Sequence, residues 1–118
     1  MTPTTITIPD ERPMSWNAFY SGKHWRHRKT EADRVHTIVR VYLPHLNAYT
    51  VPVAITVTAY FKNRPLDPDN IPAKLYIDGL CGWILADDTR KQIHSVTTQS
   101  RVDKKNPRLV ITIQEAQP

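Results

Sequence analysis

Residues 51–90 read VPVAITVTAYFKNRPLDPDNIPAKLYIDGLCGWILADDTR, and they contain the elements around which the chain is expected to fold. The side chains of residues 51–61 alternate between two faces of an expected strand, and both faces are mainly apolar or β-branched. This is typical of a strand in the centre of a sheet. A Lys-Asn-Arg-Pro sequence ends this strand, and acidic residues follow it. Because sites in α/β sheets often lie beyond the carboxyl end of a central strand, we expect a functional site just after residue 61.

A helix is expected after the first acidic residues. Asn70 suits the N-cap position, and Pro72 suits the first turn, where its missing N–H costs nothing. Gly82 is expected to end the helix. Apolar residues recur between these points at helical spacing and predict a stripe that faces the core: Ala73, Ile77, Leu80, Cys81 and Ile84.

The chain before residue 51 predicts a strand, a loop and another helix. Residues 4–8 alternate apolar and polar side chains, as a short strand does, and a loop rich in aromatic residues continues to Gly22. These aromatics either stack with nucleotide bases or cover the edge of the core. A helix is expected from about Thr30, and Pro44 either ends it or opens its last turn. Its apolar face consists of Ala32, Val35, Ile38, Val39, Tyr42 and Leu46.

Two strands are expected after the acidic residues. In the first, Ile93 is expected on one face, and the opposite face carries His94, Val96, Thr98 and Val102. Residues 103–107 form a turn, and a second strand alternates after it, with Leu109, Ile111 and Ile113 on one face. Two consecutive strands joined by a short turn predict a hairpin.

These elements predict a small single domain over residues 1–118, of the α/β (α+β) class. We expect a mixed sheet of about four strands with two main helices, in the order strand, helix, strand, helix, strand, strand. The length of 118 residues fits one domain. The single cysteine, Cys81, excludes an internal disulfide and suits a reducing cytoplasm. Neither a membrane span nor a signal peptide is expected from the sequence.

Acidic residues are concentrated in one part of a basic chain. Residues 67–88 carry one Lys and five Asp, a formal charge of −4, whereas the rest carries fifteen Lys or Arg against six Asp or Glu, a charge of +9. A divalent cation would offset the crowded carboxylates, since Mg²⁺, Mn²⁺ and Ca²⁺ prefer oxygen ligands. The basic remainder favours a nucleic-acid partner, although many basic proteins bind no polyanion in particular.

Asp67-Pro68-Asp69-Asn70 places two carboxylates two residues apart, so in an extended segment both would point the same way. The pair Asp87-Asp88 follows the expected helix, where the chain can return to the same place. Three carboxylates from two loops would form a hard-metal site with room for water and a phosphate. The same residues are also good turn formers, and the spacing does not fit a calcium-binding EF-hand loop.

The most basic stretch of the chain lies before the first expected helix and is our candidate for contact with phosphates. It consists of Lys23, Arg26, Arg28 and Lys29, with His24 and His27 among them. The two histidines could instead ligate a transition metal, and a solvated basic segment is the third interpretation.

The acidic motif resembles that of the RusA family of Holliday-junction resolvases. The resemblance rests on Asp67-x-Asp69-Asn70, a helical Lys74, Asp78-x-Leu80 and Asp87-Asp88, and it extends to Ile6-x-Ile8-Pro9 and a loop asparagine, Asn17. It implies a homodimeric, Mg²⁺-dependent endodeoxyribonuclease that resolves four-way DNA junctions by symmetric paired nicks, without a small-molecule cofactor. It also implies the cytoplasm of a bacterial or phage-infected cell.

Carried over residue by residue, the resemblance implies metal ligation by Asp67, Asp69 and Asp88, with Asp87 as a second ligand or a supporting acid. Lys74 matches the essential lysine of the family, although one more residue separates it from Asn70 than in the family pattern, and Mn²⁺ could replace Mg²⁺. The residues expected to support this site are Asn70 and Asp78, and those expected to contact DNA are Asn17, Lys23, Arg26, Arg28, Lys29 and Arg64.

Other functions remain open on the sequence alone. A non-catalytic nucleic-acid-binding module would use the acids only as helix caps, and a metal-dependent nuclease could act on flaps or RNA instead of junctions. A small scaffold protein fits the clustered acids least well. Trp83, Ile84 and Leu85 suit either an exposed apolar patch in a dimer interface or the core.

Overall fold

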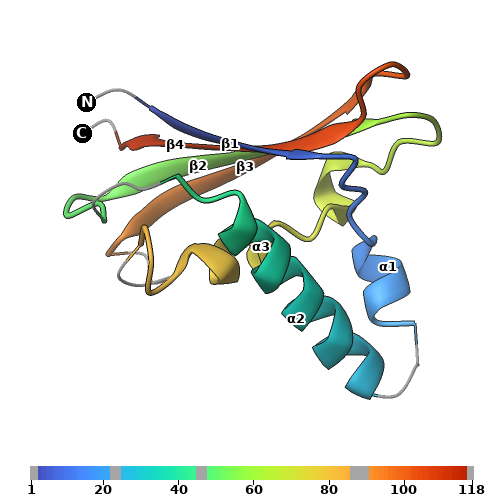
Figure 1. Ribbon diagram of the computed structural model, residues 1–118, viewed down its shortest axis with the longest axis horizontal. Coiled ribbons are helices and arrows are strands. Elements are labelled where there is room, and N and C mark those ends of the chain that lie inside the picture. The colour runs from blue at the N-terminus through green and yellow to red at the C-terminus, as the bar shows by residue number, and fades with distance from the viewer. Residues whose placement is uncertain (1–2, 22–24, 45–47, 86–90, 117–118) are drawn as a thin grey trace.

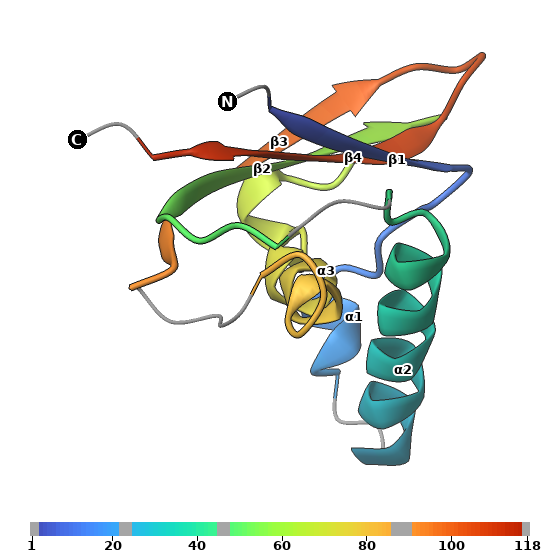
Figure 2. The same cartoon turned by 60° about the vertical axis from the view of Figure 1, so that its left-hand side comes forward.

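The computed structural model describes residues 3–21, 25–44, 48–85 and 91–116 of the chain. A four-stranded mixed sheet forms one layer, and the helices cover one of its faces (Figures 1 and 2). The strands are β1 (Thr4–Pro9), β2 (Val53–Phe61), β3 (Ile93–Val102) and β4 (Arg108–Glu115), in the spatial order β1-β4-β2-β3. The predicted fold class, a small mixed α/β domain, is confirmed.

Two main helices, as expected, pack on the sheet: α2 (Trp25–Val41) and α3 (Ala73–Leu80). A single turn of helix, α1 (Trp16–Phe19), lies within the segment expected to be an irregular loop, and a 3-10 turn, η1 (Pro68–Asn70), lies within the acidic motif. Within the described ranges, none of the helices combines the length and apolar character needed to cross a membrane.

The core lies between the sheet and the helices. Alternate residues of β2 are buried as expected, and their partners on β4 are buried as well: Ile55 pairs with Ile113, Val57 with Ile111 and Ala59 with Leu109. Because directly paired residues point to the same side of a sheet, these rows form one apolar face. Val35 and Val39 of α2, both fully buried, and the apolar side of α3 complete the core.

The predicted hairpin of the last two strands is wrong. β2 lies between them, since it pairs with β3 in parallel and with β4 in antiparallel orientation. The turn at 103–107 therefore passes over the end of β2, where the Asp103 N–H donates to the Phe61 carbonyl at 2.9 Å. Two strand spacings amount to roughly 10 Å, a distance that five residues can span. Alternation identifies the buried face of a strand, but it carries no information on the strand's neighbours.

A β-bulge displaces the first residues of β3. Val53 pairs with Ile93 whereas Ala54 pairs with Ser95, so His94 is an extra residue without a partner on β2. Val96 pairs with the buried Ile55, and thus lies on the same face as Ile93. The prediction that Ile93 and Val96 lie on opposite faces is therefore wrong, because a bulge shifts the alternation by one residue.

The ends of both main helices differ from the prediction. α2 begins at Trp25, five residues before the expected start, and ends at Val41, before Pro44. α3 begins at Ala73, because Ile71 and Pro72 have non-helical backbone angles. It ends at Leu80, two residues before Gly82, which adopts a positive φ of 83°.

After α3, the apolar residues divide between the core and the surface. Ile84 and Leu85 are buried, but they reach the core from a turn that follows α3 and not from a continued helix. Both donate their N–H groups to the Leu80 carbonyl. Trp83 is exposed. One member of the expected apolar patch therefore lies on the surface, and two lie in the core.

A polar cluster with buried acidic groups joins the segment after β1 to both main helices. The Arg34 guanidinium donates to both carboxylate oxygens of Glu11 and of Glu31, at 2.9 to 3.0 Å, and the Tyr76 hydroxyl donates to Glu11 at 2.7 Å. The two Glu residues are buried, so each needs a cation or donor to offset its desolvation. Hydrogen bonds to Glu31 and Glu11 raise the pKa of Arg34, and burial, together with Glu11, raises the pKa of Tyr76. The cluster thereby fixes α3 against α2.

Candidate active site

A cavity of about 570 Å³ lies between the acidic segment and β3. Four elements contribute to its walls: α1, η1, α3 and the bulged end of β3. Its polar and aromatic lining residues are Trp16, Asp69, Lys74, Asp78, His94, Ser95 and Thr98. Three of the residues expected in the site, Asp69, Lys74 and Asp78, therefore line one cavity.

The N-terminal segment is hydrogen-bonded to the acidic motif. The Asn17 N–H donates to Asn70 Oδ1 at 3.2 Å, across 53 residues of sequence. The prediction that Asn70 is the N-cap of the following helix is therefore wrong. Its side chain accepts a hydrogen bond from α1 instead, and α3 begins three residues later, at Ala73. The side chain of Ser15 caps α1 itself by accepting from the Ala18 N–H at 3.0 Å. Consequently α1, with its aromatic residues, is held beside Asp69.

The two carboxylates of the acidic motif lie on a turn. Asp67 has extended backbone angles, φ −65° and ψ 148°, but Pro68–Asn70 form η1 and the chain bends there. The expectation of one extended segment is therefore wrong for the part that contains Asp69. Asp67 precedes η1 at the N-cap position, yet its side chain makes no capping hydrogen bond. Both aspartates are exposed, and in the part of the chain described here neither carboxylate forms an ion pair.

Lys74 and Asp78 face each other on α3. The Lys74 ammonium donates to Asp78 Oδ1 at 3.2 Å, one helical turn away. Ile71 and Pro72 precede α3 with non-helical backbone angles, so Lys74 is the second residue of the helix. A change of length in this linker would leave the spacing within α3 intact, whereas an insertion inside the helix would rotate every later side chain by about 100°.

The remaining acids expected in the site, Asp87 and Asp88, lie outside the described residues. Among those that are described, no three His, Cys, Asp or Glu side chains group closely enough to hold a metal ion. The donor set of Asp67 and Asp69 nevertheless fits a hard divalent cation, because both carboxylates are exposed, Asp67 makes no capping bond, and no described cation pairs with either of them.

The expected DNA-contacting residues lie in separate places. Lys23, like His24, lies outside the described part of the chain. Arg26, Arg28 and Lys29 belong to the first two turns of α2 and not to a segment before the helix, which corrects the prediction. Lys29 pairs with Asp33 at 2.9 Å on the exposed side of this helix.

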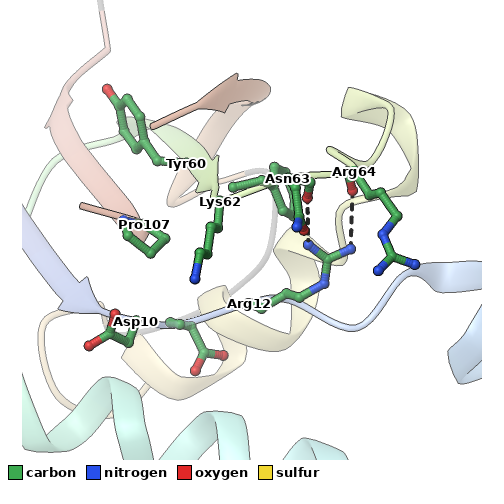
Figure 3. A pocket seen from close by; sticks show the side chains of 9 residues that line it. Asp10, Arg12, Tyr60, Lys62, Asn63, Arg64 and Pro107 are labelled. Carbon is green, nitrogen blue, oxygen red and sulfur yellow. Dashed lines mark hydrogen bonds between the residues drawn. The ribbon is translucent and has the colours of Figure 1, made fainter. Parts of the chain in front are cut away.

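Arg64 lines another cavity, of about 470 Å³, at the carboxyl end of β2 (Figure 3). There Arg12 donates to the carbonyls of Asn63 and Arg64, at 3.3 and 3.1 Å, and Lys62 points toward the segment that holds Asp10 (Figure 3). Asp10 and Arg64 both have positive φ angles, 57° and 47°. Arg12 therefore holds a strained turn in place.

Sequence reasoning did not identify His94 or Thr98 as site residues. The position of His94 depends on the bulge in β3, and no residue pattern marks a bulge of this kind. The Glu11, Arg34 and Tyr76 cluster was missed as well, although a Glu placed directly after a strand-ending Pro-Asp was visible in the sequence. Their partners come from segments far apart in the chain, so only the fold brings them together.

A scan against protein-family models found no match for this chain, and a search of curated proteins found none either.

Proposed function

We propose that this protein is a Mg²⁺-dependent endodeoxyribonuclease that acts on branched DNA and resolves four-way junctions by symmetric paired nicks. The observation that carries the proposal is the single cavity lined by Asp69, Lys74 and Asp78, with Asn70 bonded to α1 at its side. These are the residues through which the acidic motif resembles the RusA family. The proposal includes a homodimer, since two opposed strands are cut, and a cytoplasmic location.

The charge distribution supports a polyanionic substrate. The first turn of α2 contains no acidic residue, although Arg26 and Arg28 lie there beside the positive end of the helix dipole. Cations at a helix N-terminus are locally unfavourable, because the helix dipole is positive there. A DNA phosphate nearby would interact favourably with the arginines and with the dipole. Arg28 lies over the ring of Tyr20, the residue that ends α1, and α1 borders the cavity.

The residues of the acidic motif and of α3 have proposed roles, and of these Asp69, Lys74 and Asp78 line the cavity, whereas Asp67 lies two residues before Asp69 and is not among the lining residues. Asp67 and Asp69, with Asp87 or Asp88, would hold the cation, which supplies polarisation of the scissile phosphate and activation of water. The Lys74 ammonium would bind a non-bridging phosphate oxygen and offset the charge that develops in the transition state. Asp78 keeps that ammonium in place through its hydrogen bond. Products would carry 5′-phosphate ends that a ligase can join.

The main competing function is DNA binding without cleavage. In that case the acids would serve as helix caps, but the Asp67 side chain makes no capping bond and the Asn70 side chain is engaged by Asn17. The lack of a capping bond favours a ligand role for the Asp67 carboxylate over a capping role.

The test is cleavage of a synthetic mobile four-way junction beside a linear duplex, a flap and an RNA hairpin of matched sequence, each with Mg²⁺, with Mn²⁺ and with a chelator. Paired, symmetric, ligatable nicks in the junction alone, and only with metal, are expected. Equal cutting of the flap would mean that the substrate is branched DNA in general and not the four-way junction in particular. Metal-independent binding without any nick would overturn the nuclease proposal.

A further inference from the structure

The aromatic side chains of α1 form two groups with different environments. Phe19 is buried and meets the rings of Trp16 and Tyr20 edge-on, at centroid distances of 5.6 and 4.9 Å. Trp16 and Tyr20 instead stack on each other at 5.6 Å, with 18° between their planes, and Tyr20 is 64% exposed. Phe19 belongs to the core and the half-buried Trp16 packs against it, but the core does not account for the exposed Tyr20 ring stacked on Trp16.

Cations accompany the exposed aromatics. The Arg28 guanidinium lies over the Tyr20 ring, 5.9 Å from its centroid, and Arg26 lies over the exposed ring of Trp25 at 5.7 Å. Alternating aromatic and cationic groups on one surface are the usual composition of sites for single-stranded nucleic acid, where bases stack and phosphates pair with the cations.

The position of Trp16 connects this surface to the candidate active site. Trp16 lines the same cavity as Asp69 and Lys74, and the bond from Asn17 to Asn70 holds α1 against that cavity. A strand whose phosphate lies at Asp69 and Lys74 would therefore bring a neighbouring base close to the aromatic pair.

We propose that Trp16 and Tyr20 form a stacking surface for an unpaired nucleobase. The ligand is a base that has left its helix, as at a branch point or in a single strand, and it adds to the phosphate contacts made by α2. The position of the strand rests on the proposed function, whereas the preference for an unpaired base rests on the exposed Tyr20 ring stacked on the half-buried Trp16 ring. Every base has an aromatic face, so the surface would discriminate paired from unpaired bases and not one sequence from another.

The experiment compares a short oligothymidylate with an abasic oligomer of the same length and charge, in chelator without metal. Affinity is measured by fluorescence anisotropy, and tryptophan quenching is followed in parallel. The native protein is expected to bind the thymine strand about tenfold more tightly, which corresponds to stacking of one base. Trp16→Ala and Tyr20→Leu should remove that difference and leave the affinity for the abasic strand unchanged.

Trp83→Ala is the matched control, because Trp83 is also exposed and also lies under an arginine, Arg40, at 5.5 Å. It should retain the full preference for the thymine strand. Tyr20→Leu keeps the experiment decisive if Trp16→Ala fails to fold, because the Tyr20 ring is mostly exposed, and Tyr20→Phe should restore the preference.

Equal affinity of the native protein for both strands would overturn the stacking proposal, and so would a preference that survives Tyr20→Leu. Neither measurement involves cleavage. A preserved thymine preference in a protein that never nicks DNA would therefore count against the nuclease alone, and junction cleavage without the preference would count against stacking alone.

Discussion

Single residues decide the chemistry proposed here, and Asp69 is the most informative of them. Asp69→Asn removes one carboxylate from the cavity and leaves a side chain of the same shape. We expect junction cleavage to fall at least a hundredfold, because a neutral amide is a poor ligand for a hard cation. Binding of the junction should be unchanged or tighter, since a negative charge is lost. Cleavage assays and gel-shift assays on the same junction measure the two effects.

Asp10→Asn is the charge-matched control for that experiment. Asp10 is exposed and lies in the other cavity, and asparagine tolerates its positive φ of 57°. It should cut junctions at the native rate. Parallel losses of binding and cleavage in Asp69→Asn would contradict the role assigned to this carboxylate.

Tyr76 tests the buried polar cluster. Burial, with the charge of Glu11, raises the pKa of its hydroxyl above the usual value of 10.0. Above pH 10 the unfolded chain therefore releases this proton while the folded chain retains it, so stability is lost as the pH rises through this range. Tyr76→Phe should cost about 1 to 2 kcal/mol at neutral pH, through the lost hydrogen bond, and should flatten the alkaline loss.

Denaturant titrations between pH 7 and pH 11 measure both changes for Tyr76→Phe. Tyr42→Phe, at an exposed ring, serves as the control and should follow the native protein. An unchanged alkaline profile in Tyr76→Phe would show that the Tyr76 proton does not link folding to pH.

At the scale of elements, the packing of α3 on α2 depends on Gly79. A Cβ at this position would lie 3.1 Å from Val39 Cβ and 3.3 Å from His36 Cα, on a helix whose Val39 is fully buried. Gly79→Ala should therefore destabilise the protein by about 1 kcal/mol or more, although alanine favours helices by roughly that amount.

A double-mutant cycle with Val39→Ala, measured by denaturant unfolding, tests whether the close contact with Val39 causes that loss of stability. The shorter side chain makes room, so Gly79→Ala should cost less in the Val39→Ala background than in the native one. Additive costs would mean that the two helices are free to move apart at this point.

At the scale of the whole molecule, an acidic site lies in a basic chain with a net charge of +5. DNA binding should therefore weaken steeply with salt, because each phosphate contact releases a counterion. Arg28→Gln, in the first turn of α2, should lower the slope of log K against log salt by about 1. Arg40→Gln, in the last turn of the same helix, should leave the slope unchanged. Equal slopes for the native protein and Arg28→Gln would exclude a phosphate contact by Arg28.

The sequence by itself determined which residues of β1, β2 and β4 would be buried and where acids and cations would concentrate. Alternation in β2 and β4 follows from the geometry of a single strand, so Ile55, Val57, Leu109 and Ile111 could be assigned to the core without a partner.

Only the tertiary structure decided which elements would become neighbours. The insertion of β2 between β3 and β4, the bulge at His94 and the bond from Asn17 to Asn70 each join residues that are distant in the chain or depend on a partner strand. Periodicity describes how one element faces the core, whereas pairing and cavity formation depend on the free energy of packing several elements at once, which no local pattern contains.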